Sequence, residues 1–328
     1  MVPAPDPEGC PNPLNPCLAK SVAFDHPLPC MSMKRTLIGL ALMCSTMAAH
    51  ADFWHAPPRT VPQLEYEAAA AYTSDSRISL GQARLGTVEA VQTRLVVGWA
   101  ARPTDNFSYR VAAEYRRNDF DTPPGMPIPK VLGNVGLQLT GNWSLLKDLS
   151  FWANARPGIY SDFLDLSWGD VNVPFNAVLA WEANEDLLWM LGVYVDLRSQ
   201  YSVLGGPGVR WRFADNWTLN LVMPRPQIEL QASEDLLLFA GAEWRQVAYR
   251  TSRDNGTRTA ANPALDGRML DYREWRLGGG FQYRFNRHFN LGFEGGYVLD
   301  RRWVYYQADT QLSDNGAGYV GLSLNGRF

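Results

Sequence analysis

From Leu64 to the last residue, apolar and polar positions alternate with a period of two, in segments of about ten residues. In the segment 91–99, the apolar phase holds Val91, Leu95, Val97 and Trp99. The same alternation recurs in the segments 107–115, 173–181, 187–195, 275–283 and 289–297. A period of two puts alternate side chains on opposite faces of a strand, so we predict an all-β protein whose strands each have one apolar face.

The last segment, residues 318–328, is organised in the same way and ends the chain on an aromatic residue. Val320, Leu322, Leu324 and Phe328 share one phase, and the other phase is mainly polar. A terminal strand of this kind resembles the closing strand of Gram-negative outer-membrane β-barrels, which typically ends in an aromatic residue. The resemblance implies that Phe328 is a signal for barrel assembly.

Short polar turns and longer polar connections follow the segments alternately. The turns are at Asp105-Asn106, Lys147-Asp148, Glu185-Asp186, Asp215-Asn216, Glu234-Asp235 and Asn286-Arg287. The other connections are expected at 73–88, 117–130, 160–171, 199–206, 249–270 and 300–317, with a tight one at 224–226. This order predicts a single closed antiparallel transmembrane β-barrel over residues 64–328, with about 14 strands. The short central segments also allow about 12 or 16.

Aromatic residues gather where the predicted strands end. Trp99, Trp181, Trp189, Trp217 and Phe285 lie beside the short turns. A second set is expected at the opposite strand ends and comprises Tyr115, Tyr160, Trp168, Tyr201, Trp244, Tyr249, Tyr272, Trp275 and Tyr297. Two aromatic belts are typical of the two interfaces between lipid and water, which favours a membrane barrel over a soluble sandwich.

The amino-terminal region has a different character and indicates export. Residues 1–32 are rich in proline without periodicity, and we interpret them as disordered sequence upstream of the true start. Residues 33–51 combine Lys34 and Arg35, a short apolar core and the small residues Ala49 and Ala51, as a signal peptide does. Residues 52–63 are then a short periplasmic lead, and the predicted location is the outer membrane.

Composition excludes several other classes of protein. The four cysteines all precede residue 45, so a predicted mature chain has neither a disulfide nor a thiolate metal site. The formal charge of −3, from 30 basic and 33 acidic residues, does not favour a nucleic-acid partner. The expected partners are outer-membrane lipid, the barrel-assembly machinery and small solutes.

The residues with catalytic potential are sparse. After the predicted cleavage only His55 and His288 remain, and neither is expected near the outer rim, where barrel enzymes carry a histidine base. We therefore expect no enzyme, no cofactor and no metal. A calcium site built from loop residues such as Asp254, Asp266 and Asp271 is the weaker alternative.

The inward phase of the strands carries the charged residues, since a charge facing lipid is costly. The set expected to face the lumen is Arg94, Arg110, Glu114, Arg116, Arg156, Glu182, Asp196, Arg198, Arg210, Arg212, Glu243, Arg245, Glu274, Arg276, Arg284 and Glu294, with Glu65, Glu67, Glu229, Asp300 and Arg327 in the same phase. These charges either line a water-filled pore or neutralise one another as a brace. We accordingly expect a passive pore or solute-uptake channel, with a non-conducting structural or surface-interaction barrel as the alternative.

Two stretches also resemble a family of outer-membrane barrels that is defined only as a domain of unknown function. They are the segment 216–226, Asn-Trp-Thr-Leu-Asn-Leu-Val-Met-Pro-Arg-Pro, and the segment 236–243, Leu-Leu-Leu-Phe-Ala-Gly-Ala-Glu. The resemblance implies the barrel fold over most of the chain after residue 51, and no activity.

Cleavage is expected after Ala51, because small residues occupy positions 49 and 51 and a polar stretch begins at Asp52. Amino-terminal sequencing of the protein from an outer-membrane fraction checks this, and Asp52 is the expected first residue. A chain that keeps Cys44 with a bound lipid would contradict the assignment.

Overall fold

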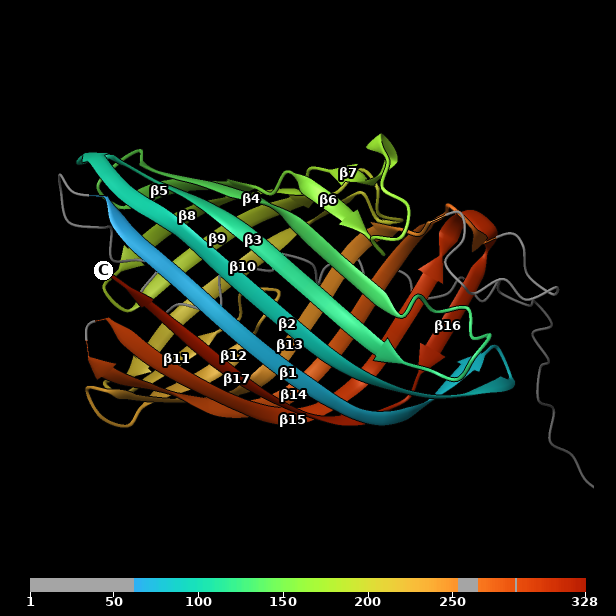
Figure 1. Cartoon of the computed structure of the whole chain (residues 1–328). Helices are drawn as coiled ribbons and strands as arrows, with labels where there is room; N and C mark the ends of the chain where they lie inside the picture. Colours follow the sequence, from blue (N-terminus) through green and yellow to red (C-terminus); the bar gives the residue numbers. More distant parts are fainter. Residues whose placement is uncertain (1–61, 253–264, 287) are drawn as a thin grey trace, which may run out of the picture.

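The computed structural model describes residues 62–252, 265–286 and 288–328, and these form a closed β-barrel (Figure 1). The predicted upstream segment, the signal peptide and nearly all of the lead lie outside the described residues, as do Asp254 and Arg287. No helix in the described part of the chain is long and apolar enough to cross a membrane.

Seventeen strand segments make up the sheet. They are β1 Gln63–Leu80, β2 Ala83–Thr104, β3 Phe107–Asp121, β4 Val131–Ser144, β5 Leu149–Ala155, β6 Gly158–Ser161, β7 Val171–Asn172, β8 Phe175–Asn184, β9 Leu187–Val195, β10 Val203–Ala214, β11 Trp217–Asn220, β12 Gln227–Gln231, β13 Leu236–Arg250, β14 Met269–Asn286, β15 Phe289–Tyr305, β16 Thr310–Asp314 and β17 Ala317–Arg327. Within the described residues, two short 3-10 turns, η3 Trp168–Asp170 and η5 Tyr306–Ala308, lie in connections.

Three wall strands are interrupted, which reduces the seventeen segments to fourteen antiparallel strands around the barrel. β5 and β6 both pair with β4, β7 and β8 continue one another, and β16 and β17 both pair with β1 and β15. The barrel closes where β17 pairs with β1, from Arg327 opposite Glu65 to Tyr319 opposite Thr73. The predicted fold and strand number are therefore confirmed.

The alternation along each strand sets which face meets lipid. In β2, Val97 is 49% exposed on the outside of the isolated barrel, whereas its neighbour Val96 is 0% exposed inside it. Val91, Leu95 and Trp99 are exposed like Val97. A strand alternates its side chains between two faces, so the apolar phase of the sequence becomes the outer surface of the barrel.

The aromatic belt is confirmed at one end of the barrel only. Trp99, Trp181, Trp189, Trp217 and Phe285 are exposed beside the short turns, at what we call the short-turn end. At the opposite, long-loop end, Trp168 and Tyr297 are exposed, but Tyr160, Trp244, Tyr249 and Tyr272 are buried. For those four the belt prediction is wrong, because their side chains pack in buried apolar clusters.

Two connections predicted as loops are strands. β1 runs to Leu80 and β2 begins at Ala83, so residues 73–88 form a hairpin that turns at Gly81, with φ +60°. β15 likewise continues to Tyr305, and β16 occupies part of 300–317. These segments looked like loops because they are polar, yet their buried polar side chains pair with one another, as Ser76 does with Asp314 at 2.6 Å.

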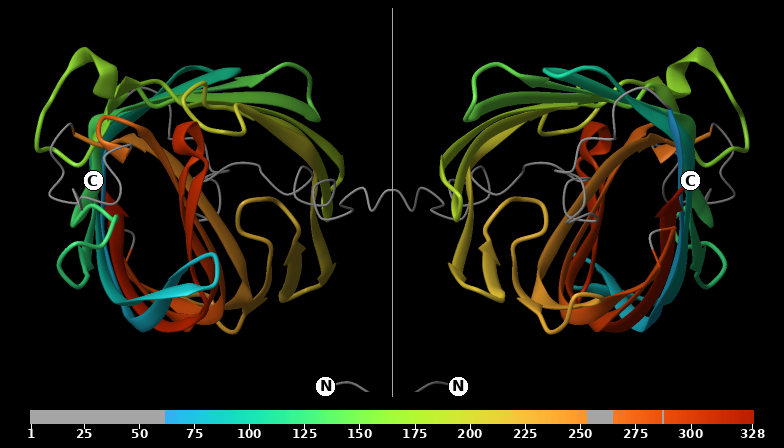
Figure 2. Two further views of the ribbon diagram at one scale, coloured as in Figure 1. Left: turned by 90° about the vertical axis from the view of Figure 1, so that its right-hand side faces the viewer. Right: turned by 90° about the vertical axis from the view of Figure 1, so that its left-hand side faces the viewer.

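The half of β13 nearest the long loops leaves the barrel perimeter and crosses the interior (Figure 2). Arg250 at its end pairs with Ser161 of β6, on the other side of the barrel. Tyr249 accepts a hydrogen bond from Asn118 of β3 at 3.3 Å. This crossing divides the interior into a polar chamber, between β1–β3 and β13–β17, and a side lobe between β5, β8–β10 and the other face of β13 and β14.

An apolar plug fills the long-loop end of the polar chamber. It is built by the buried side chains of Ile78, Val88, Ala90, Phe120, Met126, Ile128, Leu132, Tyr160, Tyr249, Leu265, Leu270, Tyr272, Trp303, Tyr305 and Leu312. Met126 and Ile128 belong to the connection 122–130 between β3 and β4, which folds back into the mouth of the barrel. Burial of these side chains stabilises the closed mouth.

Phe328 takes part in barrel closure directly. Its backbone N–H donates to the Leu64 carbonyl at 2.8 Å, the Leu64 N–H donates back at 3.1 Å, and its ring stacks on Tyr66 at 5.7 Å. We expect deletion of Phe328, or Phe328→Asp, to reduce the amount of assembled barrel strongly. Deletion removes the backbone partner of Leu64, and Phe328→Asp removes the ring that stacks on Tyr66.

The measurement is the amount of heat-modifiable barrel in the outer membrane. Phe285→Asp is the matched control, because it removes an exposed aromatic of the same belt away from the closing pair. Normal levels of barrel without Phe328 would contradict its role in closure.

Candidate functional site

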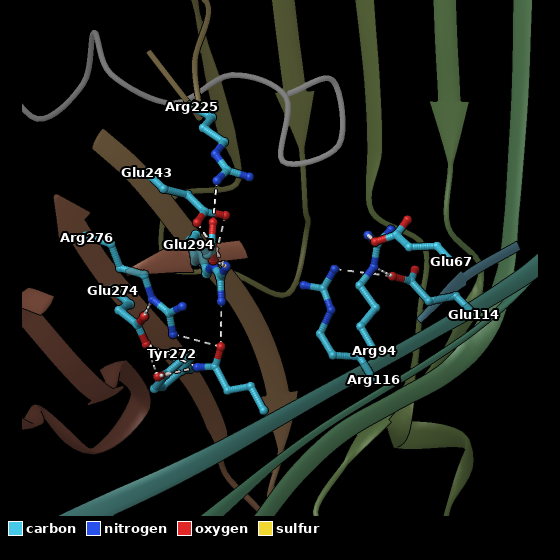
Figure 3. A network of polar contacts seen from close by, with 12 residues as sticks. Glu67, Arg94, Glu114, Arg116, Arg225, Glu243, Tyr272, Glu274, Arg276 and Glu294 are labelled. Atoms are coloured by element: carbon cyan, nitrogen blue, oxygen red, sulfur yellow. Dashed lines mark hydrogen bonds and ion pairs between the residues drawn. The ribbon is translucent and has the colours of Figure 1, made fainter. Parts of the chain in front are cut away.

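The polar chamber holds a cavity of about 170 Å³ that is lined by charges of both signs (Figure 3). Its lining comes from strands far apart in the sequence, including β1, β2, β3, β13, β14, β15 and β17. Gly292 and Gly321 form part of this wall, where an added Cβ would meet the Ser323 and Glu294 side chains respectively.

On the β1–β3 side, Glu114 holds two arginines together. The register places Arg94 directly opposite Arg116, so the two like charges would repel one another if nothing lay between them. Glu114 accepts from Arg94 at 3.0 Å and from Arg116 at 3.2 Å, and Arg94 also pairs with Glu67. The Glu114 side chain is 2% exposed, so it serves as a buried counter-ion.

On the opposite side, further ion pairs arise from β13, β14, β15 and the turn 221–226. Arg245 binds Glu243 through two nitrogens, at 2.8 and 2.9 Å, and Arg225 of the turn pairs with Glu294 of β15. Arg276 pairs with Glu274, and both side chains are 0% exposed. Charge-assisted, bidentate contacts of this kind hold the side chains in one geometry.

Gln92 of β2 joins the two sides. Its carbonyl oxygen accepts from Arg245 of β13 and, at 2.8 Å, from Arg276 of β14. Its amide donates to Glu274 at 3.3 Å and to the Tyr272 hydroxyl at 3.4 Å. The two charged sides therefore meet across the chamber through a neutral side chain, whereas the ion pairs described above each stay on one side.

The other residues expected to face the lumen lie outside this central network. Arg110 donates to Glu65 at 2.7 Å, Arg210 to Glu229 at 2.8 Å and Arg156 to Asn154 at 3.2 Å. Near the long loops, Asn172 donates to buried Asp196 at 2.9 Å and Arg198 donates to the Gly169 carbonyl. Glu182, Arg212 and Arg284 are exposed at the short-turn end and are not brought together with the network.

Asp196 lies in the turn after β9, outside the strands. Burial raises the pKa of its carboxyl above the ordinary aspartate value, and the Asp271 carboxylate nearby raises it further. Hydrogen bonds from Asn172 and the Arg198 N–H lower the pKa in part. Asp196 in the turn and Asp271 in β14 therefore repel one another when both are charged.

Residues suited to metal binding are not gathered in the described part of the chain, where no three His, Cys, Asp or Glu side chains form a group. Asp271 accepts from Arg273 and Ser199 at 2.8 and 2.9 Å, both on its Oδ2 atom. His288 lies at the short-turn end, where its ring stacks on Phe328 at 5.4 Å.

Several residues of the network were not predicted as site residues. Gln92 is neutral, so a search for charges passes over it, although it lies in the inward phase two residues before Arg94. Arg225 lies between two prolines and was assigned to a tight turn. The buried pair Arg301–Asp314 fell in a segment expected to be a loop.

The buried pair at Arg276 should matter more for stability than the exposed pair Arg212–Asp186, whose side chains are 50% and 53% exposed. Arg276→Ser leaves Glu274 buried without its main partner, and we expect a loss of about 3–5 kcal/mol in the free energy of unfolding. Arg212→Ser should cost about 0–1 kcal/mol. Urea unfolding of the two variants in detergent compares them, and equal losses would contradict the burial argument.

Comparison with known proteins gives one family and several distant structural likenesses. No curated protein matches the chain. An outer membrane channel from Pseudomonas putida F1 is 11% identical with a TM-score of 0.46, covering 85% of this chain and 100% of that one. A Pseudomonas aeruginosa FadL homologue is 12% identical with a TM-score of 0.40, covering 81% and 89%, and the NanC porin is 16% identical with a TM-score of 0.37, covering 79% and 98%.

These likenesses are too distant to carry any substrate over to this chain. The match to a family model is more specific, because it extends over residues 102–313, more than half of the chain. The expected resemblance to a family without a known function is thereby confirmed, and the chain belongs to the family described as Domain of unknown function (DUF6268).

Proposed function

We propose that this protein is an outer-membrane solute-uptake channel and that the structure represents its closed state. The supporting observation is the hollow, charged interior of a closed transmembrane wall, with a cavity of about 170 Å³. Burying ion pairs is costly, and replacing them by apolar side chains is often neutral or stabilising. Ionisable groups kept at membrane depth therefore point to a path for polar solutes.

The apolar plug closes the chamber toward the long loops. Met126 and Ile128 are 5% and 1% exposed within the plug, and the Tyr305 hydroxyl holds the same connection by donating to the Pro127 carbonyl at 3.1 Å. Because the connection 122–130 belongs to no strand, it can withdraw without breaking the barrel wall. We assign it the role of the gate.

The lining indicates the kind of solute. Arginines and carboxylates face one cavity in nearly equal numbers, so neither an anion nor a cation alone is favoured. A small polar molecule that carries both charges, or none, fits this lining best. The contacts of Gln92 across the chamber favour a gated path over a permanently open diffusion pore.

The second candidate is a non-conducting structural or surface-interaction barrel. The apolar plug favours this candidate, because a permanently closed barrel would also have a layer of buried apolar side chains across its interior. In that case the ion pairs would only brace the wall.

Loosening the gate separates the two candidates. Met126→Ser with Ile128→Ser removes two apolar anchors of the connection, so a channel should open more often and raise the conductance of a planar bilayer by about tenfold. Pro124→Ser is the matched control, because Pro124 lies in the same connection and is exposed.

A folded double variant that conducts no more than the wild type would favour the structural barrel. Folding is checked by heat modifiability in the same samples. Uptake of zwitterionic and neutral solutes into vesicles that contain the variant then tests the proposed solute class.

A further inference from the structure

The barrel wall has a break between β10 and β13. β10 pairs with β9 from Val203 to Trp211, but with β11 only from Arg210 to Ala214. β11 and β12 contain 4 and 5 residues and reach only part of the way from the short-turn end. The half of β10 nearest the long loops therefore has a strand neighbour on one side only, within the described residues.

β13 shows the matching gap. It pairs with β12 from Leu237 to Gly241, and its next two bonds on that side go to the turn 221–226, from Ala242 and Trp244 to the Pro226 and Pro224 carbonyls. Beyond Trp244, the described strand pairing on this side is limited to Arg250 with Ser161 of β6.

The sequence marks the same edge. Pro207 lies within β10 and has no N–H to donate, and prolines in sheets are confined to edges. On the side of β10 away from β9, the Val209 carbonyl accepts a hydrogen bond from the Leu221 N–H. Backbone groups two residues apart in a strand point to the same side, so the backbone nitrogen of Pro207 faces the break. A proline at this point is compatible with an edge and not with a fully paired wall strand.

An open strand edge cannot face lipid, so something must cover the break. The turn 196–202, which we call the latch, covers it through side chains. The Ser199 hydroxyl donates to Asp271 at 2.9 Å and accepts from the Gln246 amide. Arg273 donates to the Gln200 side chain at 2.8 Å and stacks on Tyr201 at 4.5 Å.

The closed latch is incompletely bonded. Among the described residues, Trp244 Nε1, Gln246 Oε1, Asp271 Oδ1 and Arg273 Nε are buried without a hydrogen-bond partner. A buried polar atom without a partner costs free energy, and opening would expose these atoms. The latch therefore closes the break with a few side-chain hydrogen bonds. The unpaired buried atoms destabilise this closed state, and opening would remove that free-energy cost.

Behind the latch, the side lobe contains two apolar clusters. Leu204, Trp244, Tyr194 and Trp275 pack together around Met223. Met223 also contacts the neighbouring cluster of Trp152, Val178, Ala180, Met190, Val222 and Leu188. Charged groups lie at the edge of these clusters, where the Tyr194 hydroxyl donates to Asp196 at 3.4 Å.

We propose that the latch is a lateral gate, through which a small apolar molecule dissolved in the bilayer enters the barrel wall and binds in the side lobe. The break supplies the opening, the latch supplies the closure and the lobe supplies the apolar surroundings. The site is separate from the polar chamber and does not depend on the proposed uptake of polar solutes.

The test uses thiol labelling of the mature chain, from which the predicted cleavage removes every cysteine. Met223→Cys places a thiol in the side lobe of the full barrel in phospholipid vesicles, and we call this thiol the lobe thiol. The probes are an alkyl maleimide that partitions into the bilayer and a charged maleimide confined to water.

Ser199→Ala weakens the latch, since it removes the bonds to Asp271 and Gln246. Ser202→Ala is the matched control, because its hydroxyl bonds the Ser199 carbonyl within the turn at 3.2 Å. We expect alkyl maleimide to label the lobe thiol about tenfold faster with Ser199→Ala than with Ser202→Ala. Gln246→Ala is a second latch variant in case the first fails to fold.

Labelling of the lipid-facing variant Leu191→Cys reports whether each barrel is intact in the membrane, since Leu191 is 60% exposed on the wall. Saturating the vesicles with an unreactive alkane should slow the labelling of the lobe thiol and leave that of the Leu191→Cys thiol unchanged. Equal rates in the latch and control variants would overturn the proposal. Faster labelling by the charged reagent would overturn it as well, because the site would then open to water.

Discussion

The need to pair every backbone N–H and C=O group inside the lipid determines the rest of this structure. A sheet meets that need by closing on itself, and here the first and last strands pair from Glu65–Arg327 to Thr73–Tyr319. Closure then fixes which side chains face lipid, since each strand has one phase outside and one inside. Where strand pairing stops, at the ends of β10 and β13, other groups must cover the open strand edges.

The charges in the interior follow from the same constraint. Arginine and glutamate are excluded from the lipid face, and within the barrel each carries a desolvation cost that only close partners offset. Glu114 between Arg94 and Arg116, and Gln92 between Arg245 and Arg276, are the contacts that do so. The result is a network that spans the chamber while leaving a cavity beside it.

The strand phase could be predicted from the sequence because it is a local property: Val96 and Val97 differ in exposure as the alternation requires. The hairpin over residues 73–88 could not be predicted, because a polar strand has the composition of a loop. The inward path of β13 depends on contacts with β3 and β6, which lie far earlier in the chain, and no local pattern encodes such a contact. For the same reason, the sequence predicts which charged residues face the interior but not which residues they contact there.

Opposite walls of the polar chamber are joined through Gln92, and a double-mutant cycle measures this link. Gln92→Ala and Arg276→Ser, made singly and together, give a coupling free energy of unfolding from urea titrations. Residues in contact should show a coupling of about 0.5–3 kcal/mol, whereas Gln138→Ala with Arg276→Ser should be additive within about 0.5 kcal/mol. Additive effects for Gln92 and Arg276 would show that the walls are not joined and would contradict the account.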